Sequence, residues 1–125
     1  DAVADACEAR GIDTIAFFAT GFTATRRFYR NRLEARGLRV LVSPKPVVRA
    51  LDRIILEELA AGIVKPASRE AYRDALDTLR AEGAQAMVLG CTEIGMLVGP
   101  EDVDVPVLDT TLLHVEAAVD WALSS

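Results

Sequence analysis

The chain has 125 residues, and its 14 Lys and Arg against 19 Asp and Glu give a formal net charge of −5. With 51% hydrophobic and 26% charged residues, it has the composition of one packed globular domain, which argues against extensive disorder. The acidic balance leaves no domain-wide basic surface for nucleic acid, and no apolar run is long enough to span a membrane.

The first half of the chain alternates helical and strand patterns. Residues 1–10 place apolar side chains at helical spacing, and residues 14–19 form a short apolar run that is typical of a buried parallel strand. An arginine-rich amphipathic helix is predicted at residues 23–36. A strand at residues 38–42 ends before two prolines, and the clearest helical pattern follows at residues 47–59.

The second half continues the same alternation. A helix is predicted over residues 68–82, capped by the serine that opens it, and residues 86–90 form a third apolar strand. A short helix at residues 93–98 and a fourth strand at residues 105–108 come next. Residues 109–111 can cap a last helix.

Strands that alternate with helices predict an α/β fold. We expect a single flavodoxin-like lobe over residues 1–125, with a four-stranded, mostly parallel sheet flanked by helices on both sides. In such sheets, ligands bind beyond the carboxyl ends of the strands. The segments to search for chemistry are therefore residues 20–23, 43–46, 90–93 and 109–111.

Cys91 is the first candidate for a reactive group. It follows the third predicted strand and precedes a short predicted helix, where backbone N–H groups and the positive helix end would stabilise a thiolate. Such a thiol can act as a nucleophile or as a proton shuttle, but a small buried residue that closes a strand fits the position equally well. Cys7 lies on the apolar stripe of the first helix and is expected to pack in the core. Two cysteines are too few for a disulfide framework, so the expected compartment is the cytoplasm.

Hydroxyl groups gather at the predicted strand ends, where they can bind a small carboxylate or simply cap helices. They belong to Thr20, Thr23, Thr92, Thr110 and Thr111. Lys65, in a loop between two helices, could pair with a second carboxylate of an acidic ligand, although most loop lysines only face water. His114 is the only histidine, and it is either a hydrogen-bond partner near the site or a partly buried helix residue. One histidine without an acidic or cysteine cluster predicts no metal site.

Four segments carry a resemblance to a known family. Residues 88–94 (VLGCTEI), followed by residues 105–114 (VPVLDTTLLH), resemble the C-terminal half of the cofactor-independent aspartate/glutamate racemases. Residues 19–23 (ATGFT) and the helix after them are similar to the opening of that family's second lobe, and residues 62–68 match its lysine-bearing loop. The resemblance covers essentially the whole chain.

The resemblance implies two related α/β lobes with the active site between them. Each lobe supplies one cysteine: one thiolate removes the α-proton of the amino acid, and the opposite thiol returns a proton to the other face. Cys91 matches the catalytic cysteine of the second lobe. The family's reaction needs no cofactor, and the implied substrate is a small acidic amino acid or a related carboxylate.

The other residue roles also follow from the resemblance. Thr92 matches the substrate-binding threonine beside the cysteine, and Thr23 matches a hydroxyl that contacts the ligand carboxylate. Lys65 matches the lysine near the distal carboxylate. Glu93 and His114 belong to the same motifs and are candidate supporting residues.

The first lobe, with its own cysteine, has no counterpart in this sequence, and Cys7 does not replace it. Because the chain also begins with Asp1 rather than Met, we expect one lobe of a longer protein, inactive by itself. Its expected partners are the missing lobe and further copies of itself, but neither nucleic acid nor a membrane. The alternatives are a lobe of a hydantoin racemase or maleate isomerase, or a flavodoxin-like binding or regulatory domain that is not an enzyme.

Overall fold

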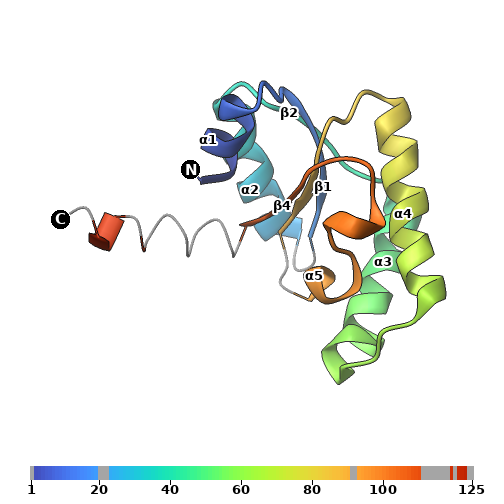
Figure 1. Cartoon of the computed structure of the whole chain (residues 1–125). Coiled ribbons are helices and arrows are strands. Elements are labelled where there is room, and N and C mark those ends of the chain that lie inside the picture. Colours follow the sequence, from blue (N-terminus) through green and yellow to red (C-terminus); the bar gives the residue numbers. More distant parts are fainter. Residues whose placement is uncertain (1, 20–22, 91–92, 111–118, 120, 124–125) are drawn as a thin grey trace.

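Four parallel strands form one sheet in the order β2-β1-β3-β4 (Figure 1). The computed structural model describes residues 2–19, 23–90, 93–110, 119 and 121–123. Its strands are β1 (Thr14–Phe18), β2 (Arg39–Leu41), β3 (Met87–Leu89) and β4 (Val107–Asp109). Its helices are α1 (Ala2–Ala9), α2 (Thr23–Ala35), α3 (Lys45–Glu57), α4 (Pro66–Ala81) and α5 (Ile94–Leu97), with 3₁₀ turns η1 (Leu59–Ala61) and η2 (Pro100–Asp102). The predicted α/β class is confirmed, and every strand pair is parallel.

The direction in which the chain adds strands to the sheet reverses between the two central strands, β1 and β3. From β1 the chain crosses to β2 on one side, and it then returns to place β3 and β4 on the other side. This order matches the first four strands of a flavodoxin-like sheet, whose switch point lies between β1 and β3. The predicted flavodoxin-like topology is therefore confirmed, and ligands are expected beyond the carboxyl ends of these two strands.

Each face of the sheet carries its own hydrophobic core. Successive side chains of β1 alternate between the faces, so that Ile15 packs with α1 and α2, whereas Ala16 packs with α3, α4 and α5. All five residues of β1 are buried, as the apolar run predicts for a strand covered on both sides. Figure 1 shows α1 and α2 on one side of the sheet and α3 and α4 on the other.

The start of α4 differs from the prediction. The helix begins at Pro66 with Lys65 as its N-cap, so Ser68 is the third helical residue rather than the cap. Proline suits the first position because its fixed φ is already helical and the missing N–H would have no partner within the helix. The Ser68 hydroxyl instead donates a hydrogen bond to the carboxylate of Glu58. Ser68 thus joins the two ends of the loop that carries Lys65.

The last predicted helix falls largely outside the described residues. Residues 119 and 121–123 are helical, and three large apolar side chains among them are exposed. These are Val119, Trp121 and Leu123, which are 50%, 74% and 81% exposed.

Candidate active site

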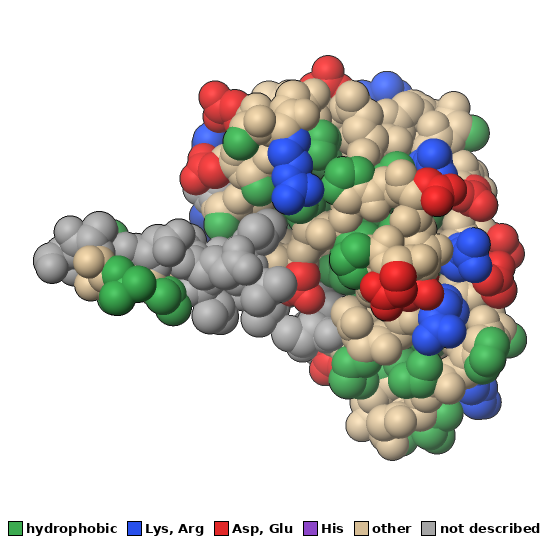
Figure 2. Space-filling model, viewed as in Figure 1, with side chains coloured by type: hydrophobic (Ala, Val, Ile, Leu, Met, Phe, Trp, Pro, Cys, Tyr) green, Lys and Arg blue, Asp and Glu red, His purple; other side chains and the backbone are tan. Residues whose placement is uncertain are grey.

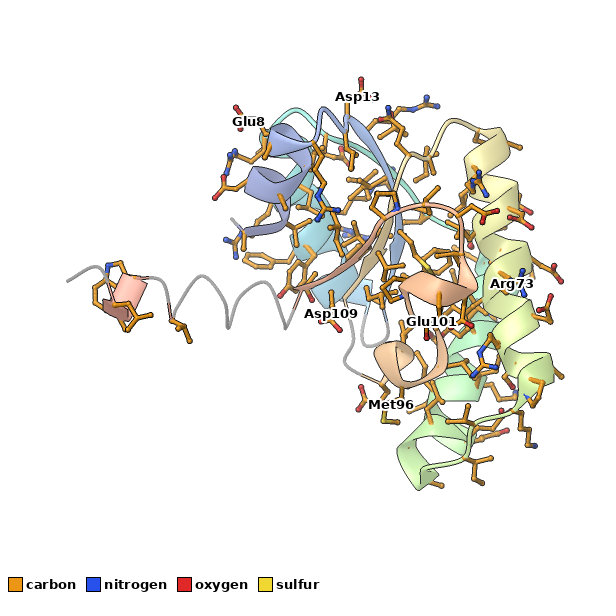
Figure 3. The ribbon with its side chains drawn as sticks, viewed as in Figure 1. Glu8, Asp13, Arg73, Met96, Glu101 and Asp109 are labelled. Atoms are coloured by element: carbon orange, nitrogen blue, oxygen red, sulfur yellow. The ribbon has the colours of Figure 1, made fainter. Side chains whose placement is uncertain are left out.

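The strands β1, β3 and β4 end at the same edge of the sheet. Their last residues, Phe18, Leu89 and Asp109, are aligned as Cα partners across the sheet. The segments that sequence patterns single out after these strands therefore start side by side. In Figure 3, Asp109 lies on the same lower side of the molecule as Met96 of α5, whereas Glu8 and Asp13 lie at the opposite end.

Gly90 closes β3 directly before Cys91. Its N–H donates a hydrogen bond to the carbonyl oxygen of Phe18 at 2.7 Å. A Cβ atom at position 90 would lie 2.9 Å from the Cβ of Ala19 and 3.0 Å from a ring carbon of Phe17. Because real Cβ atoms do not approach other atoms this closely, only glycine lets the ends of β1 and β3 pack as they do.

We expect Gly90→Ala to lower the free energy of unfolding by about 1–3 kcal/mol, since the added methyl group overpacks this junction. Urea unfolding measures the loss. The double variant Ala19→Gly/Gly90→Ala, compared with Ala19→Gly alone, removes the nearest contact and should show a smaller loss. Unchanged stability of Gly90→Ala would contradict the close contact.

The predicted helix at residues 93–98 is confirmed as the single turn α5. Ile94 and Leu97 are fully buried, and the backbone N–H of Met96 donates to the carbonyl oxygen of Glu93 at 3.1 Å. Glu93 occupies the N-cap position and is half-buried. A helix of four residues carries little macrodipole, so it contributes less to a nearby thiolate than the sequence pattern suggests.

Asp109 ends β4 with its carboxylate against α5. Its Oδ2 atom lies 3.1 Å from the place where a Cβ on Gly95 would be. The strand-end position of residues 109–111 marked them in the sequence as one of the segments to search for chemistry, besides their use as helix caps. The contact between the Asp109 carboxylate and α5 was not predictable from those patterns.

Lys65 is exposed at the end of the loop between η1 and α4. Its carbonyl oxygen accepts hydrogen bonds from the backbone N–H groups of Ser68 and Arg69, both at 3.1 Å. The preceding turn passes through Gly62, whose φ of 78° lies in the left-handed region that glycine adopts easily. Since η1 also packs against α5, the loop lies on the α5 side of the fold.

Several of the remaining predicted site residues lie outside the described part of the chain. Cys91, Thr92 and His114 lie outside the described residues. Thr23 opens α2, but its side chain is not among those described. Lys65 and Glu93 are described: Lys65 lies in the loop that follows η1, Glu93 is the N-cap of α5, and η1 contacts α5.

Cys7 is confirmed as a core residue of α1. It is fully buried, and desolvation by burial raises the pKa of its thiol above the ordinary value. A raised thiol pKa disfavours the thiolate, which is the reactive form. Cys7 is therefore unsuited to proton transfer.

Within the part of the chain that the structure describes, no group of three or more His, Cys, Asp or Glu residues is placed to hold a metal ion. No helix in those same ranges combines the length and apolar character needed to cross a bilayer. Figure 2 shows acidic and basic side chains interspersed around the α4 side of the face in view.

The fold and the aligned strand ends define a parallel α/β domain with its candidate site at the switch point. The sequence model of the Asp/Glu/hydantoin racemase family matches residues 1–118. The chain belongs to this family.

Solved structures of similar proteins agree with the family match. A Yersinia pestis protein assigned to the Asp/Glu racemases is 44% identical, with a TM-score of 0.91 over 98% of this chain and 54% of that one. An aspartate racemase homologue from Pyrococcus horikoshii is 35% identical, with a TM-score of 0.89 over 98% of this chain and 54% of its own. An aspartate racemase from Picrophilus torridus, at 17% identity, a TM-score of 0.66 and coverage of 86% and 44%, shares the fold. The chain thus spans about half the length of these proteins.

Proposed function

We propose that this chain is the C-terminal lobe of a two-lobed, cofactor-independent racemase that interconverts the L- and D-forms of aspartate or glutamate. The observation that carries the proposal is the family membership of a lobe in which Cys91 directly follows Gly90 at the switch point. The other lobe would supply the second cysteine. We call the protein that contains both lobes the two-lobed protein.

In the proposed reaction, one cysteine thiolate takes the α-proton and becomes a thiol, leaving a carbanion that the α-carboxylate stabilises as an enediolate. The thiol on the opposite face then donates its proton to the same carbon and becomes the thiolate. No electrons are gained or lost, and the amino acid leaves with inverted configuration. Cys91 is one of the two thiols.

The substrate is proposed to be held by charge and hydroxyl groups of this lobe. Thr23 and Thr92 bind the α-carboxylate, and Lys65 pairs with the distal carboxylate. Glu93 and His114 support this arrangement. The exposure of Lys65, on a loop that reaches α5 through η1, supports its availability to an anionic ligand. In a chain of net charge −5, an acidic substrate requires such a local cation.

Chiral chromatography of aspartate, glutamate and a hydantoin, incubated with the two-lobed protein freed of added cofactors, tests the proposal. We expect racemisation of an acidic amino acid, because Lys65 favours a dicarboxylate. Racemisation of the hydantoin alone would instead assign the site to hydantoin substrates, which the family name also includes. Binding of aspartate in calorimetry without any racemisation would instead indicate a binding domain.

We also propose that the isolated lobe self-associates through its C-terminal residues, as exposed apolar side chains such as Trp121 favour. Sedimentation equilibrium is expected to show oligomers that Trp121→Ser weakens. Leu56→Ser is the matched control, since Leu56 of α3 is also 72% exposed but lies elsewhere in the fold. A strictly monomeric profile of the unmodified chain would contradict this proposal.

A further inference from the structure

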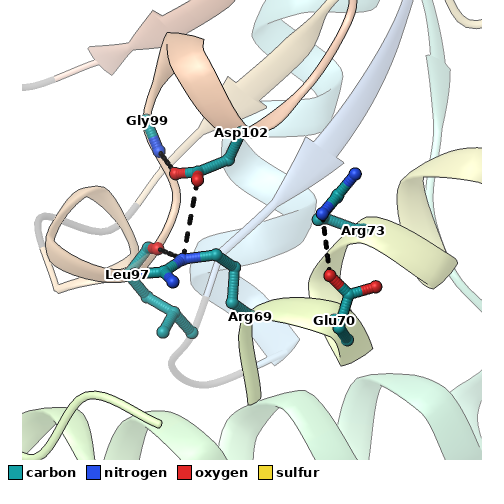
Figure 4. Close-up of polar contacts among 6 residues, drawn as sticks. All are labelled: Arg69, Glu70, Arg73, Leu97, Gly99 and Asp102. Atoms are coloured by element: carbon teal, nitrogen blue, oxygen red, sulfur yellow. Dashed lines mark hydrogen bonds and ion pairs between the residues drawn. The ribbon is translucent and has the colours of Figure 1, made fainter. Parts of the chain in front are cut away.

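Arg69 connects two parts of the candidate site. Its backbone N–H donates to the carbonyl oxygen of Lys65 at 3.1 Å, within the first turn of α4. Its side-chain Nε donates to the carbonyl oxygen of Leu97, the last residue of α5, at 2.8 Å (Figure 4). A single residue therefore joins Lys65 to the short helix that follows residues 91–93.

Asp102 completes this connection. Its Oδ1 lies 3.7 Å from the Nε of Arg69, and its Oδ2 accepts a hydrogen bond from the backbone N–H of Gly99 at 2.8 Å. The side chains of Arg69 and Asp102 are only 33% and 20% exposed, so water screens this pair less than an ordinary surface pair. Asp102 thus ties the turn after α5 to the same guanidinium group.

The hydrogen bond from Arg69 satisfies a group that α5 cannot satisfy internally. The last carbonyl groups of any helix have no intrahelical donor, and in a four-residue helix this concerns most of them. Within α5, the N–H of Val98 donates to the carbonyl oxygen of Ile94 at 3.0 Å. The Leu97 carbonyl receives its donor from Arg69, and basic side chains commonly serve helix ends in this way.

The chain is also held on either side of residues 91–92. Before them, Gly90 is fixed to β1 by its hydrogen bond to Phe18. After them, Ile94 and Leu97 are buried in the core between the sheet and α4. Arg69 adds the link from this fixed segment to α4, which starts one residue after Lys65.

From these contacts we infer that Arg69 is a positioning residue, which sets the placement of Lys65 relative to the chain around Cys91 without touching the substrate. The inference rests on the proposed function. Misplacement of a binding group by about 1 Å can cost roughly 100-fold in rate. The planar guanidinium holds one orientation against its carbonyl and carboxylate partners, which a lysine at the same position would not reproduce fully.

Steady-state kinetics of the two-lobed protein tests the role of Arg69. We expect Arg69→Gln to raise KM for the acidic amino acid about 10-fold or more, and Arg69→Lys to restore part of that loss. Arg73→Gln is the matched control: Arg73 also lies on α4, in an exposed ion pair with Glu70 at 2.7 Å (Figure 4). Its KM should stay within about two-fold of the unmodified protein, since exposed pairs contribute little.

Lower stability alone would reduce the amount of active enzyme and hence kcat, with KM unchanged. An Arg69→Gln variant with unaltered KM would therefore overturn the inference. If the unmodified protein racemises nothing, the proposed function fails separately. The role of Arg69 is then tested by the rate at which iodoacetamide alkylates Cys91, with buried Cys7 as the internal reference. A changed rate at Cys91 in Arg69→Gln but not in Arg73→Gln would support positioning, and equal rates would refute it.

Discussion

Replacing Cys91 with serine is expected to lower racemisation by the two-lobed protein by roughly 10³-fold or more. A positioned acid or base contributes about 10²–10⁴-fold to rate, and a serine hydroxyl is too weak an acid to replace a thiol at neutral pH. Chiral chromatography from each enantiomer measures the loss. The rates from the L- and from the D-enantiomer should both fall, because every catalytic cycle uses Cys91 either as the base or as the acid.

Two further measurements separate this effect from misfolding. Cys91→Ser should still bind aspartate in calorimetry within a few-fold of the unmodified protein, because the residues proposed to hold the carboxylates remain. Cys7→Ala, which alters the buried thiol of α1, should leave the turnover of folded protein unchanged. Activity of Cys91→Ser above a tenth of normal would remove Cys91 from the proposed mechanism.

Lys65→Met is expected to raise KM for aspartate and glutamate by about 10- to 100-fold, with a smaller effect on kcat. Hydrogen bonds to charged groups contribute about 1.5–3 kcal/mol, and the methionine keeps the length of the side chain while removing its charge. Lys65→Arg should recover part of the affinity. KM from initial rates at several substrate concentrations measures the change.

The chain provides a matched control, because Lys45 is its only other lysine. Lys45 is exposed at the start of α3, so Lys45→Met removes the same charge from a different place. We expect KM to change by less than about two-fold, since Lys45 is not proposed to contact the substrate and the loss of an exposed charge is largely screened by salt. Equal effects of the two substitutions would show that only net charge matters and would exclude Lys65 as the carboxylate ligand.

The fold was predictable because its signals are local. The apolar run of β1 predicted a strand covered on both faces, and all five of its residues are buried. The predicted start of α4 was wrong because Ser68 has the residue type of a helix cap. In the structure the helix begins at Pro66, and the Ser68 hydroxyl donates a hydrogen bond to Glu58. Local patterns cannot distinguish these two uses of a serine hydroxyl.

The candidate site was predictable only in part. Position after a strand and family motifs indicated Cys91, but position alone left a packing role open. The contact between Arg69 and Leu97 joins residues 28 positions apart, which no periodic pattern reveals. Likewise, the need for glycine at position 90 arises from the side chains of Phe17, on the neighbouring strand, and Ala19, just after it.

Racemisation in heavy water tests the central claim most directly. We predict that, at low conversion by the two-lobed protein, the product enantiomer of aspartate or glutamate carries one solvent deuterium at the α-carbon, while the recovered substrate enantiomer remains unlabelled. That pattern requires separate groups on the two faces of the carbon, and Cys91→Ser should abolish it. Absence of deuterium from both enantiomers would contradict the assignment of this lobe to a two-cysteine racemase.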